Sequence, residues 1–357
     1  MAQFSVKIKN TKVPASQTSF PAIVDLADMP AAFHSTVTPS GGDIRCFESD
    51  GTTELARAVV SYDAATDTGE LWVKVSNLSA IADTEIIVDV DGARSDYAAT
   101  DIYGSEAVFT EAQIAVLMES TTPIDWAGNH TLMAENDITI VSGPYGTALN
   151  FEGFRSDLYT TETGIVNLPT SFDMTVSVIS RVPLLDGRTN SATVGWSGAD
   201  DLILYSHEDD GNPVDGARVF WRDFGITTSL QKDNVSSANT WDYFSFSSFA
   251  ADDHRLYSDG GLVDNATDTG TSSGFSRFDI GGWAGGQSFN GDVAQVIVYK
   301  TARSDDWITT EYNNQYRPST FYIVTEIGGA TAPTLSAVSA VNITANSITP
   351  QVTLDFP

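Results

Sequence analysis

Three tryptophans and one asparagine have the residue types and positions of a sugar-binding surface. Trp126, Trp221 and Trp283 fall in loops or near the ends of expected strands, and Asn129 follows Trp126 closely. Sugars stack on exposed aromatic faces and form hydrogen bonds with amide and carboxylate side chains. These four residues are therefore the candidate glycan-binding residues. The alternative for a tryptophan in a β-sandwich is a place in the core, which we expect for three others: Trp72, Trp196 and Trp241.

One acidic stretch has the composition of a calcium-binding loop. Glu208, Asp209, Asp210 and Asn212 bring four oxygen-bearing side chains into one short segment. Calcium takes about six to eight oxygen ligands, many of them from a single loop. This segment is the candidate metal site, and Ca²⁺ is the one cofactor that the sequence suggests. The alternative is a solvated acidic loop, because no complete calcium-loop pattern is present.

The sequence contains no catalytic signature. Its four histidines form neither a metal motif nor a triad pattern, and there is no His-Glu-x-x-His, Gly-x-Ser-x-Gly or glycine-rich phosphate loop. A glycosidase needs two carboxylates at a defined separation, and the Glu-x-Asp-x-x-Glu strand common in glycosidases of jelly-roll fold is missing. We therefore assign no catalytic residue and expect a protein that is not an enzyme.

The elements that must position these residues are short strands. Alternating or apolar runs separated by polar turns recur along the first block, at residues 4–8, 20–26, 58–62, 69–75 and 85–90. Such spacing predicts a β-sandwich. Residues 172–180 and 293–299 are the clearest strands of the second block. A short helix over residues 305–312 is indicated by Ser304 as N-cap and by acids in its first turn. Residues 106–121 fit either an amphipathic helix or a strand.

The last third of the chain resembles a laminin-G-like (LamG), concanavalin A-like jelly roll. The resemblance lies in Trp241, the LYSDGG turn, the FDIGGW strand, the approach NGDV and the closing segment YKTARSDDWITTEYNNQY. It implies a jelly-roll sandwich over residues 105–327. It does not imply one function, since this fold hosts lectins, glycan hydrolases, adhesins and spacers.

The first block resembles the small domain of unknown function that often precedes such modules in bacterial and phage proteins. The matching pieces are FPAIVDL, GGDIRCFESDGTTEL and GELWVKVSNLSAIADTEIIVDVDG. The resulting expectation is an all-β chain in three parts. Residues 1–104 form a small β-sandwich, residues 105–327 form the concanavalin A-like jelly roll, and residues 328–357 form a linker and a C-terminal extended β arm.

Charge and cysteine content exclude several classes of partner. The formal net charge is −29, from 18 Lys and Arg against 47 Asp and Glu. Nucleic acids and anionic membranes attract basic surfaces, so neither is expected as a partner, and membrane insertion is not expected either. Cys46 is the single cysteine, which excludes an intrachain disulfide. No N-terminal basic and apolar segment resembles a signal peptide, so we expect synthesis in a host cytoplasm.

Three functional hypotheses follow. The first is a structural virion protein of a bacteriophage or phage-like particle, a tail, fibre or head-decoration component at the virion surface. It would contact other virion subunits or itself as a homo-oligomer, and host glycans through the jelly roll. The alternative is a bacterial secreted or cell-surface glycan-binding module. The third, a glycan-degrading enzyme, is disfavoured by the missing carboxylate pattern.

Overall fold

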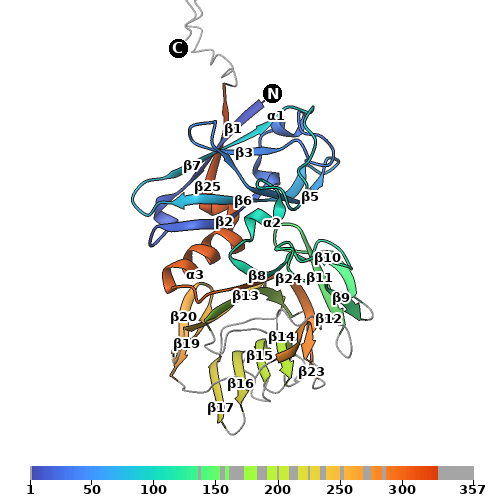
Figure 1. Ribbon diagram of the computed structural model, residues 1–357, viewed down its shortest axis with the longest axis vertical. Helices are drawn as coiled ribbons and strands as arrows, with labels where there is room; N and C mark the ends of the chain where they lie inside the picture. The colour runs from blue at the N-terminus through green and yellow to red at the C-terminus, as the bar shows by residue number, and fades with distance from the viewer. Residues whose placement is uncertain are drawn as a thin grey trace, which may run out of the picture.

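The computed structural model describes residues 2–135, 138–152, 157–160, 173–182, 191–198, 201–208, 216–223, 226–233, 239–249, 253–267, 275–283 and 287–328. These residues form two β-sandwiches, one above the other in Figure 1, with short helices between them. The expected all-β class is confirmed. Within the described residues, no helix combines the length and the apolar character needed to cross a membrane.

The first sandwich packs a five-stranded sheet against a three-stranded sheet. The larger sheet has the order β25 (Tyr322–Ile327), β1 (Ala2–Ile8), β7 (Thr84–Val90), β3 (Arg45–Glu48) and β4 (Glu54–Leu55). The smaller sheet has the order β2 (Gln17–Asp25), β6 (Thr68–Leu78) and β5 (Arg57–Asp63). Their inward side chains form a closed apolar core that includes Phe4, Phe20, Phe33 and Trp72. Short helical segments connect these strands: η1 (Asn10–Lys12), η2 (Leu26–Asp28) and α1 (Ala31–His34).

The strand β25 comes from the far end of the described chain. It pairs antiparallel with β1, with Val6 opposite Val324 and Ile8 opposite Tyr322. The chain therefore leaves the first sandwich, builds the second and returns to complete a sheet of the first. The division of the chain at residue 104 remains a prediction from sequence, and the structure adds that β25 returns to the first sandwich. The expected C-terminal arm, residues 328–357, lies outside the described residues except for Gly328.

The second sandwich is the expected jelly roll, with two large antiparallel sheets. One has the order β10 (Ile138–Ser142), β11 (Thr147–Glu152), β24 (Asn290–Tyr299), β13 (Met174–Arg181), β18 (Asp242–Phe249), β19 (Asp253–Ser258) and β20 (Gly261–Ala266), and β8 (Ala112–Val116) also pairs with β24. The other has the order β17 (Ile226–Asp233), β16 (Gly216–Asp223), β15 (Asp201–Glu208), β14 (Ser191–Gly198), β21 (Phe275–Ile280), β12 (Asp157–Thr160) and β9 (Met133–Glu135). A small ribbon joins β22 (Gly282–Trp283) to β23 (Gln287–Ser288). Of the tryptophans expected in the core, Trp72 and Trp196 are fully buried and Trp241 is partly buried.

The sheet that contains β13 and β24 is buried on both faces. Alternate residues such as Val176 and Val298 face the jelly-roll core, whereas Ile179, Ile297 and Tyr299 join the core of the first sandwich. Burial on both faces favours a nearly continuous apolar run, which is the sequence of β24. The second face is covered by α3 (Asp305–Glu311), the π-helical turn η3 (Tyr312–Tyr316) and α4 (Pro318–Phe321), which lie between the sandwiches in Figure 1.

The helix α3 begins where the sequence predicts. The Ser304 hydroxyl accepts a hydrogen bond from the Trp307 backbone amide at 3.2 Å, as an N-cap does. Residues 106–121 divide between the two expected alternatives, because α2 (Ser105–Val108) is a single helical turn and β8 follows it.

The last residue of α3, Glu311, attaches the helix to the jelly roll. Its buried carboxylate accepts hydrogen bonds from the hydroxyls of Ser177 and Tyr243 at 2.8 Å and of Tyr299 at 2.6 Å. Burial raises the pKa of Glu311, although the three hydroxyl donors act against that rise. The two sandwiches therefore meet through a shared core with a specific polar contact inside it.

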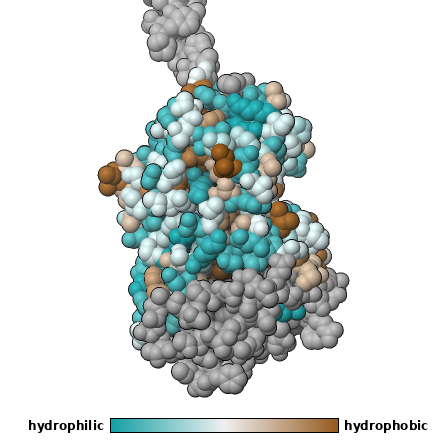
Figure 2. All heavy atoms as spheres, in the orientation of Figure 1, coloured by the Kyte–Doolittle hydropathy of each residue, from teal (hydrophilic) through white to brown (hydrophobic). Residues whose placement is uncertain are grey.

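The outer surface is largely polar. On the face shown in Figure 2, brown side chains are scattered among hydrophilic ones and form no broad patch. Exposed large hydrophobic residues among those described are Ile81, Ile102, Ile124, Met133, Ile140, Leu262, Ile323 and Ile327. Single exposed apolar side chains are normal on a protein surface, so these residues do not by themselves mark a functional site.

Candidate functional site

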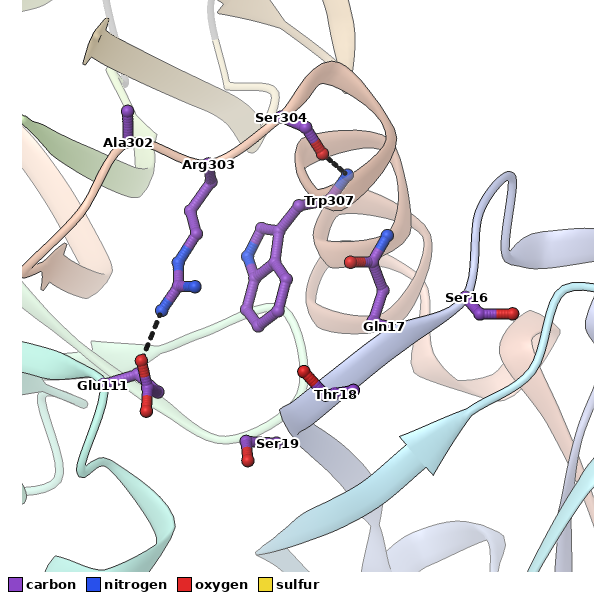
Figure 3. A pocket seen from close by; sticks show the side chains of 9 residues that line it. All are labelled: Ser16, Gln17, Thr18, Ser19, Glu111, Ala302, Arg303, Ser304 and Trp307. Carbon is purple, nitrogen blue, oxygen red and sulfur yellow. Dashed lines mark hydrogen bonds and ion pairs between the residues drawn. The ribbon is translucent and has the colours of Figure 1, made fainter. Parts of the chain in front are cut away.

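A cavity of about 370 Å³ opens at the junction of the two sandwiches. Three separate segments line it, as Figure 3 shows: the start of β2, the residue before β8, and the connection from β24 into α3. The lining residues are Ser16, Gln17, Thr18, Ser19, Glu111, Ala302, Arg303, Ser304 and Trp307. These segments are far apart in the sequence, so folding of both sandwiches is needed to form the cavity.

The loop that carries Arg303 is held in place by backbone hydrogen bonds. The Ala302 amide donates to the Asp173 carboxylate at 2.7 Å, and the Arg303 amide donates to the Thr175 hydroxyl at 2.8 Å. Ser304 then caps α3. The position of Arg303 is therefore set by the start of β13 and by the start of the helix.

The guanidinium of Arg303 rests on two aromatic rings. Its Cζ atom lies 4.2 Å from the ring centroid of Trp307 and 4.7 Å from that of Tyr299. Such cation–π contacts are worth about 0.5 to 2 kcal/mol, the larger value applying when water is excluded. Burial and the nearby Glu311 carboxylate raise the pKa of Tyr299 well above its usual value, so this ring stays a neutral phenol. The rings fix the guanidinium without using its donors.

The donors of Arg303 have no hydrogen-bond partner among the described residues. Its side chain is 13% exposed, and Nε and Nη2 are enclosed without a partner. The nearest carboxylate oxygen, Glu111 Oε2, lies 3.6 Å from Nη2, which is longer than a hydrogen bond. Burying the N–H donors of a charged group without hydrogen-bond partners lowers the stability of the folded protein. This group therefore has unused capacity to bind an acceptor.

The tryptophan in the cavity wall has a supporting role. Trp307 is 4% exposed, its ring is 5.0 Å from Phe20 and it carries Arg303 on one side. Its indole Nε1 is enclosed without a partner. Because neighbouring groups cover the ring, Trp307 positions Arg303 and does not offer an open face for a sugar to stack on.

The opposite wall offers hydroxyl groups from β2. Thr18 and Ser19 line the cavity, and their hydroxyls make no hydrogen bond within the described part of the chain. Ser19 has a φ of 53°, a left-handed backbone conformation that serine rarely adopts inside a strand. Backbone strain of this kind costs about 1 to 3 kcal/mol and concentrates at ligand sites. Ser16 and Gln17 are partly used, since Ser16 accepts from Ala80 N and Gln17 donates to Ala15 O, both at 3.0 Å.

Two lysines lie beside the cavity residue Glu111. The ammonium of Lys74 donates to the Thr110 hydroxyl at 2.6 Å, and that of Lys300 donates to the Thr110 carbonyl at 3.0 Å. In a chain with a net charge of −29, two lysines and Arg303 thus lie around one short segment that also carries the Glu111 carboxylate.

Two of the residues predicted from sequence to bind a glycan stabilise a loop. Trp126 donates from Nε1 to Glu119 Oε2 at 3.2 Å, and the Asn129 amide donates to the carbonyls of Ala112 and Gln113 at 3.3 and 3.0 Å. The loop is organised by Asp125, whose carboxylate accepts from four backbone amides: Ala115, Ala127, Asn129 and His130. Neither Trp126 nor Asn129 lines the cavity, so their role in binding stays a prediction.

The other predicted residues belong to parts of the chain that the structure describes incompletely. Trp221, Trp283 and Glu208 have their backbones in β16, β22 and β15, and their side chains lie outside the described residues. Asp209, Asp210 and Asn212 lie outside them entirely. In the described ranges, no three His, Cys, Asp or Glu side chains gather closely enough to hold a metal ion. The calcium site at residues 208–212 therefore stays a prediction.

The sequence carries only a weak signal for the cavity. The stretch Ser16-Gln17-Thr18-Ser19 is a run of polar residues at a strand start, and Arg303 and Trp307 are four residues apart at a helix start. Arg303 precedes the N-cap Ser304 and lies outside the helix, so helical spacing alone does not place it beside Trp307. An arginine just before a helix whose first turn carries a tryptophan, in a chain short of basic residues, was the available clue.

No model of a protein family matches the chain, and no curated protein matches it. Among solved structures, domain 4 of AbnA, a GH43 extracellular arabinanase from Geobacillus stearothermophilus in complex with arabinotriose, is 16% identical with a TM-score of 0.44, covering 56% of this chain and 97% of that one. The binding domain of Paraclostridial Mosquitocidal Protein 1 is 17% identical with a TM-score of 0.48, covering 58% of this chain and 53% of that one. The Ruminococcus gnavus sialidase CBM40 bound to α2,3-sialyllactose is 12% identical with a TM-score of 0.39, covering 45% of this chain and 94% of that one. At these values the similarity carries no argument about what this chain binds, and its sandwich fold rests on its own strand order.

Proposed function

We propose that the protein is a carbohydrate-binding protein and that the cavity between its sandwiches is the sugar site. One observation carries this proposal: the cavity is lined by polar groups that have hydrogen-bonding capacity to spare. Thr18 and Ser19 offer hydroxyls, Gln17 an amide oxygen and Arg303 a guanidinium. A sugar presents many hydroxyls that act as both donors and acceptors, which this mixture of groups complements.

The size of the cavity supports a small ligand. Its volume of about 370 Å³ is near the lower end of the range of about 300 to 1,000 Å³ for small-molecule sites. We infer that it takes one or two sugar rings, with any longer glycan extending into solvent. The wall is largely preformed, since Ser304 and the amides of Ala302 and Arg303 are already bonded.

The proposed role is binding without catalysis. Glycoside hydrolysis by the usual route needs two carboxyl groups on either side of the scissile bond. The cavity lining contains one, Glu111, whose side chain is 48% exposed. We therefore propose that the site recognises a sugar and leaves it unchanged.

Two narrower hypotheses remain proposals. The first is that the jelly roll is of the LamG type. The second concerns where the protein is located. A secreted or cell-surface glycan-binding module fits the proposed site, and a virion protein that assembles with itself or with other virion subunits is the competing hypothesis.

Mass spectrometry distinguishes the two. Detection of the chain in purified phage particles would favour the virion protein, and detection in a culture supernatant free of particles would favour the secreted or cell-surface module.

The test of the sugar site compares it with the loop predicted from sequence. Binding to a glycan array, followed by NMR titration with the glycans retained, is measured for the native protein and two variants. Thr18→Ala, in the cavity, is expected to weaken binding about threefold to tenfold through the loss of one hydrogen bond. Asn129→Ala, in the loop, is expected to leave binding unchanged. Loss of binding in Asn129→Ala with retention in Thr18→Ala would place the site at the loop and overturn the proposal.

A further inference from the structure

We propose that the sugar bound in the cavity carries a carboxylate, and that Arg303 receives it. This inference rests on the proposed function, and it assigns the ligand to the class of acidic sugars. Two observations lead to it: the guanidinium has donors without hydrogen-bond partners, and its nearest carboxylate is a poor partner.

The guanidinium of Arg303 is built to bind an anion and has none at hydrogen-bonding distance. A guanidinium N–H forms a charge-assisted hydrogen bond with a carboxylate, which is shorter and stronger than a bond between neutral groups. Contact with Trp307 and Tyr299 at 4.2 and 4.7 Å fixes its plane, so a ligand need not spend binding energy on ordering it. Nε and Nη2 are enclosed without partners, which leaves Nη1 as the nitrogen most open to a ligand. Close approach of an anion would offset the cost of enclosing this charge.

Glu111 does not satisfy Arg303. Its Oε2 is 3.6 Å from Nη2, and 48% of its side chain is exposed to solvent. An ion pair of this kind, with one partner in water, contributes about 0 to 1 kcal/mol. A ligand carboxylate at hydrogen-bonding distance from Nη1 would interact more strongly. Glu111 then acts as a weak competitor that repels the ligand carboxylate.

Basic groups lie near the cavity in a chain that has few of them. Lys74 and Lys300 converge on Thr110, next to Glu111. Carboxylates lie nearby as well: Asp173 accepts from the Ala302 amide, and Glu311 interacts electrostatically with Arg303. An acidic sugar is therefore favoured by the guanidinium of Arg303 itself and not by the net charge of its surroundings.

The experiment compares each acidic sugar with its own neutral ester. The probes are the methyl glycosides of glucuronic, galacturonic and N-acetylneuraminic acids, each beside its carboxylate methyl ester, and methyl glucoside and methyl galactoside as neutral sugars. Dissociation constants are measured by NMR titration, with the Trp307 indole resonance identified from a Trp307→Phe variant. At least one acid is expected to bind about tenfold more tightly than its ester, because hydrogen bonds to a charged group are the stronger ones.

Two variants and a control assign that preference to Arg303. In Arg303→Gln the acid and its ester are expected to bind equally. Arg181→Gln is the matched control, because Arg181 also rests on a tryptophan, with Cζ 4.7 Å from the Trp241 ring, but does not line the cavity. It should keep the preference. Glu111→Gln, which retains Arg303, is expected to strengthen acid binding about twofold to fivefold and to change ester binding by a smaller factor. It serves as the test if Arg303→Gln does not fold by its melting curve.

The outcomes separate this inference from the proposed function. Equal binding of acids and esters, or binding of neutral sugars alone, overturns the acidic-sugar inference and leaves the sugar site standing. An acid preference that survives in Arg303→Gln also overturns it. The absence of any shift of the Trp307 indole with every sugar on the array and in this panel overturns both.

Discussion

The side-chain amide of Asn314 is paired with both backbone groups of Ile23. Its Oδ1 accepts from the Ile23 amide at 2.8 Å, and its Nδ2 donates to the Ile23 carbonyl at 3.0 Å. Both residues are fully buried. Ile23 lies in β2, an edge strand of its sheet, so Asn314 takes the place of a neighbouring strand. The π-helical turn after α3 thereby closes an edge that would otherwise be buried with unpaired polar groups.

Removing the side-chain amide of Asn314 should lower the free energy of unfolding. Asn314→Ala leaves one N–H and one C=O of Ile23 buried without partners, so we expect the free energy of unfolding to fall by about 2 to 4 kcal/mol. The neighbouring Asn313 is the matched control, because its Nδ2 makes a single bond, to the Lys12 carbonyl at 2.9 Å, at a half-buried position. Asn313→Ala should cost about 1 kcal/mol or less. Urea denaturation measures the free energy of unfolding of both variants. Equal losses would show that the paired amide of Asn314 stabilises the fold no more than the single hydrogen bond of Asn313.

The parts of the fold that sequence predicted are those set by local pattern. The cap at Ser304 and the long strand at 293–299 are visible in consecutive residues, and α3 and β24 confirm them. The pairing of β25 with β1 joins opposite ends of the described chain. No local pattern encodes such a partner, since alternation shows that a strand has a buried face and not which strand lies beside it.

The candidate site shows the same division. Residue type drew attention to Trp126 and Asn129, but type alone does not reveal whether a side chain binds a ligand or a neighbouring loop. The free groups of the cavity, Ser19 and Arg303 among them, are brought together by the contact of two sandwiches. That contact exists after the whole chain has folded, and hence had no signature in any one stretch.

The pH dependence of stability should depend on Glu70. This residue is buried in β6, and the Trp72 indole donates to its Oε1 at 2.5 Å. Burial raises the pKa of Glu70 from 4.5 to about 8, although the Trp72 hydrogen bond acts against that rise. At pH values between 4.5 and about 8, Glu70 is protonated in the folded protein and ionised in the unfolded chain. The free energy of unfolding therefore falls as the pH rises through this range. The slope is about −1.4 kcal/mol per pH unit.

Glu70→Gln isolates this effect. The amide keeps the acceptor for Trp72 and does not titrate, so the unfolding free energy of the native protein minus that of the variant should decrease between pH 5 and pH 7.5. Urea unfolding at several pH values gives this difference. A difference that stays constant with pH would mean that Glu70 is ionised in the folded protein, against the expectation from its burial.

Gly281 should tolerate no side chain. It has a φ of +85°, and a Cβ atom there would overlap the ring of the fully buried Phe151. Gly281→Ala therefore combines backbone strain of about 1 to 2 kcal/mol with an overlap costing about 1 to 3 kcal/mol more. Gly51, with a φ of +65° and nothing near its would-be Cβ, is the matched control, because Gly51→Ala carries the first cost alone. Thermal unfolding that shifts by the same amount in both variants would contradict the packing argument.

Ser19 offers a test of whether strain serves binding. Its φ of 53° is unfavourable for any residue with a Cβ, and Ser19 is one of the residues that line the cavity. Ser19→Ala and Ser19→Gly both remove the hydroxyl, but only glycine relieves the backbone, so we expect the glycine variant to be more stable than the alanine variant by about 1 kcal/mol. Both should bind the sugar more weakly than the native protein. A glycine variant that is more stable than the native protein and binds the sugar with native affinity would contradict this prediction. The Ser19 hydroxyl would then contribute nothing to binding, and the strained backbone would have no role in the site.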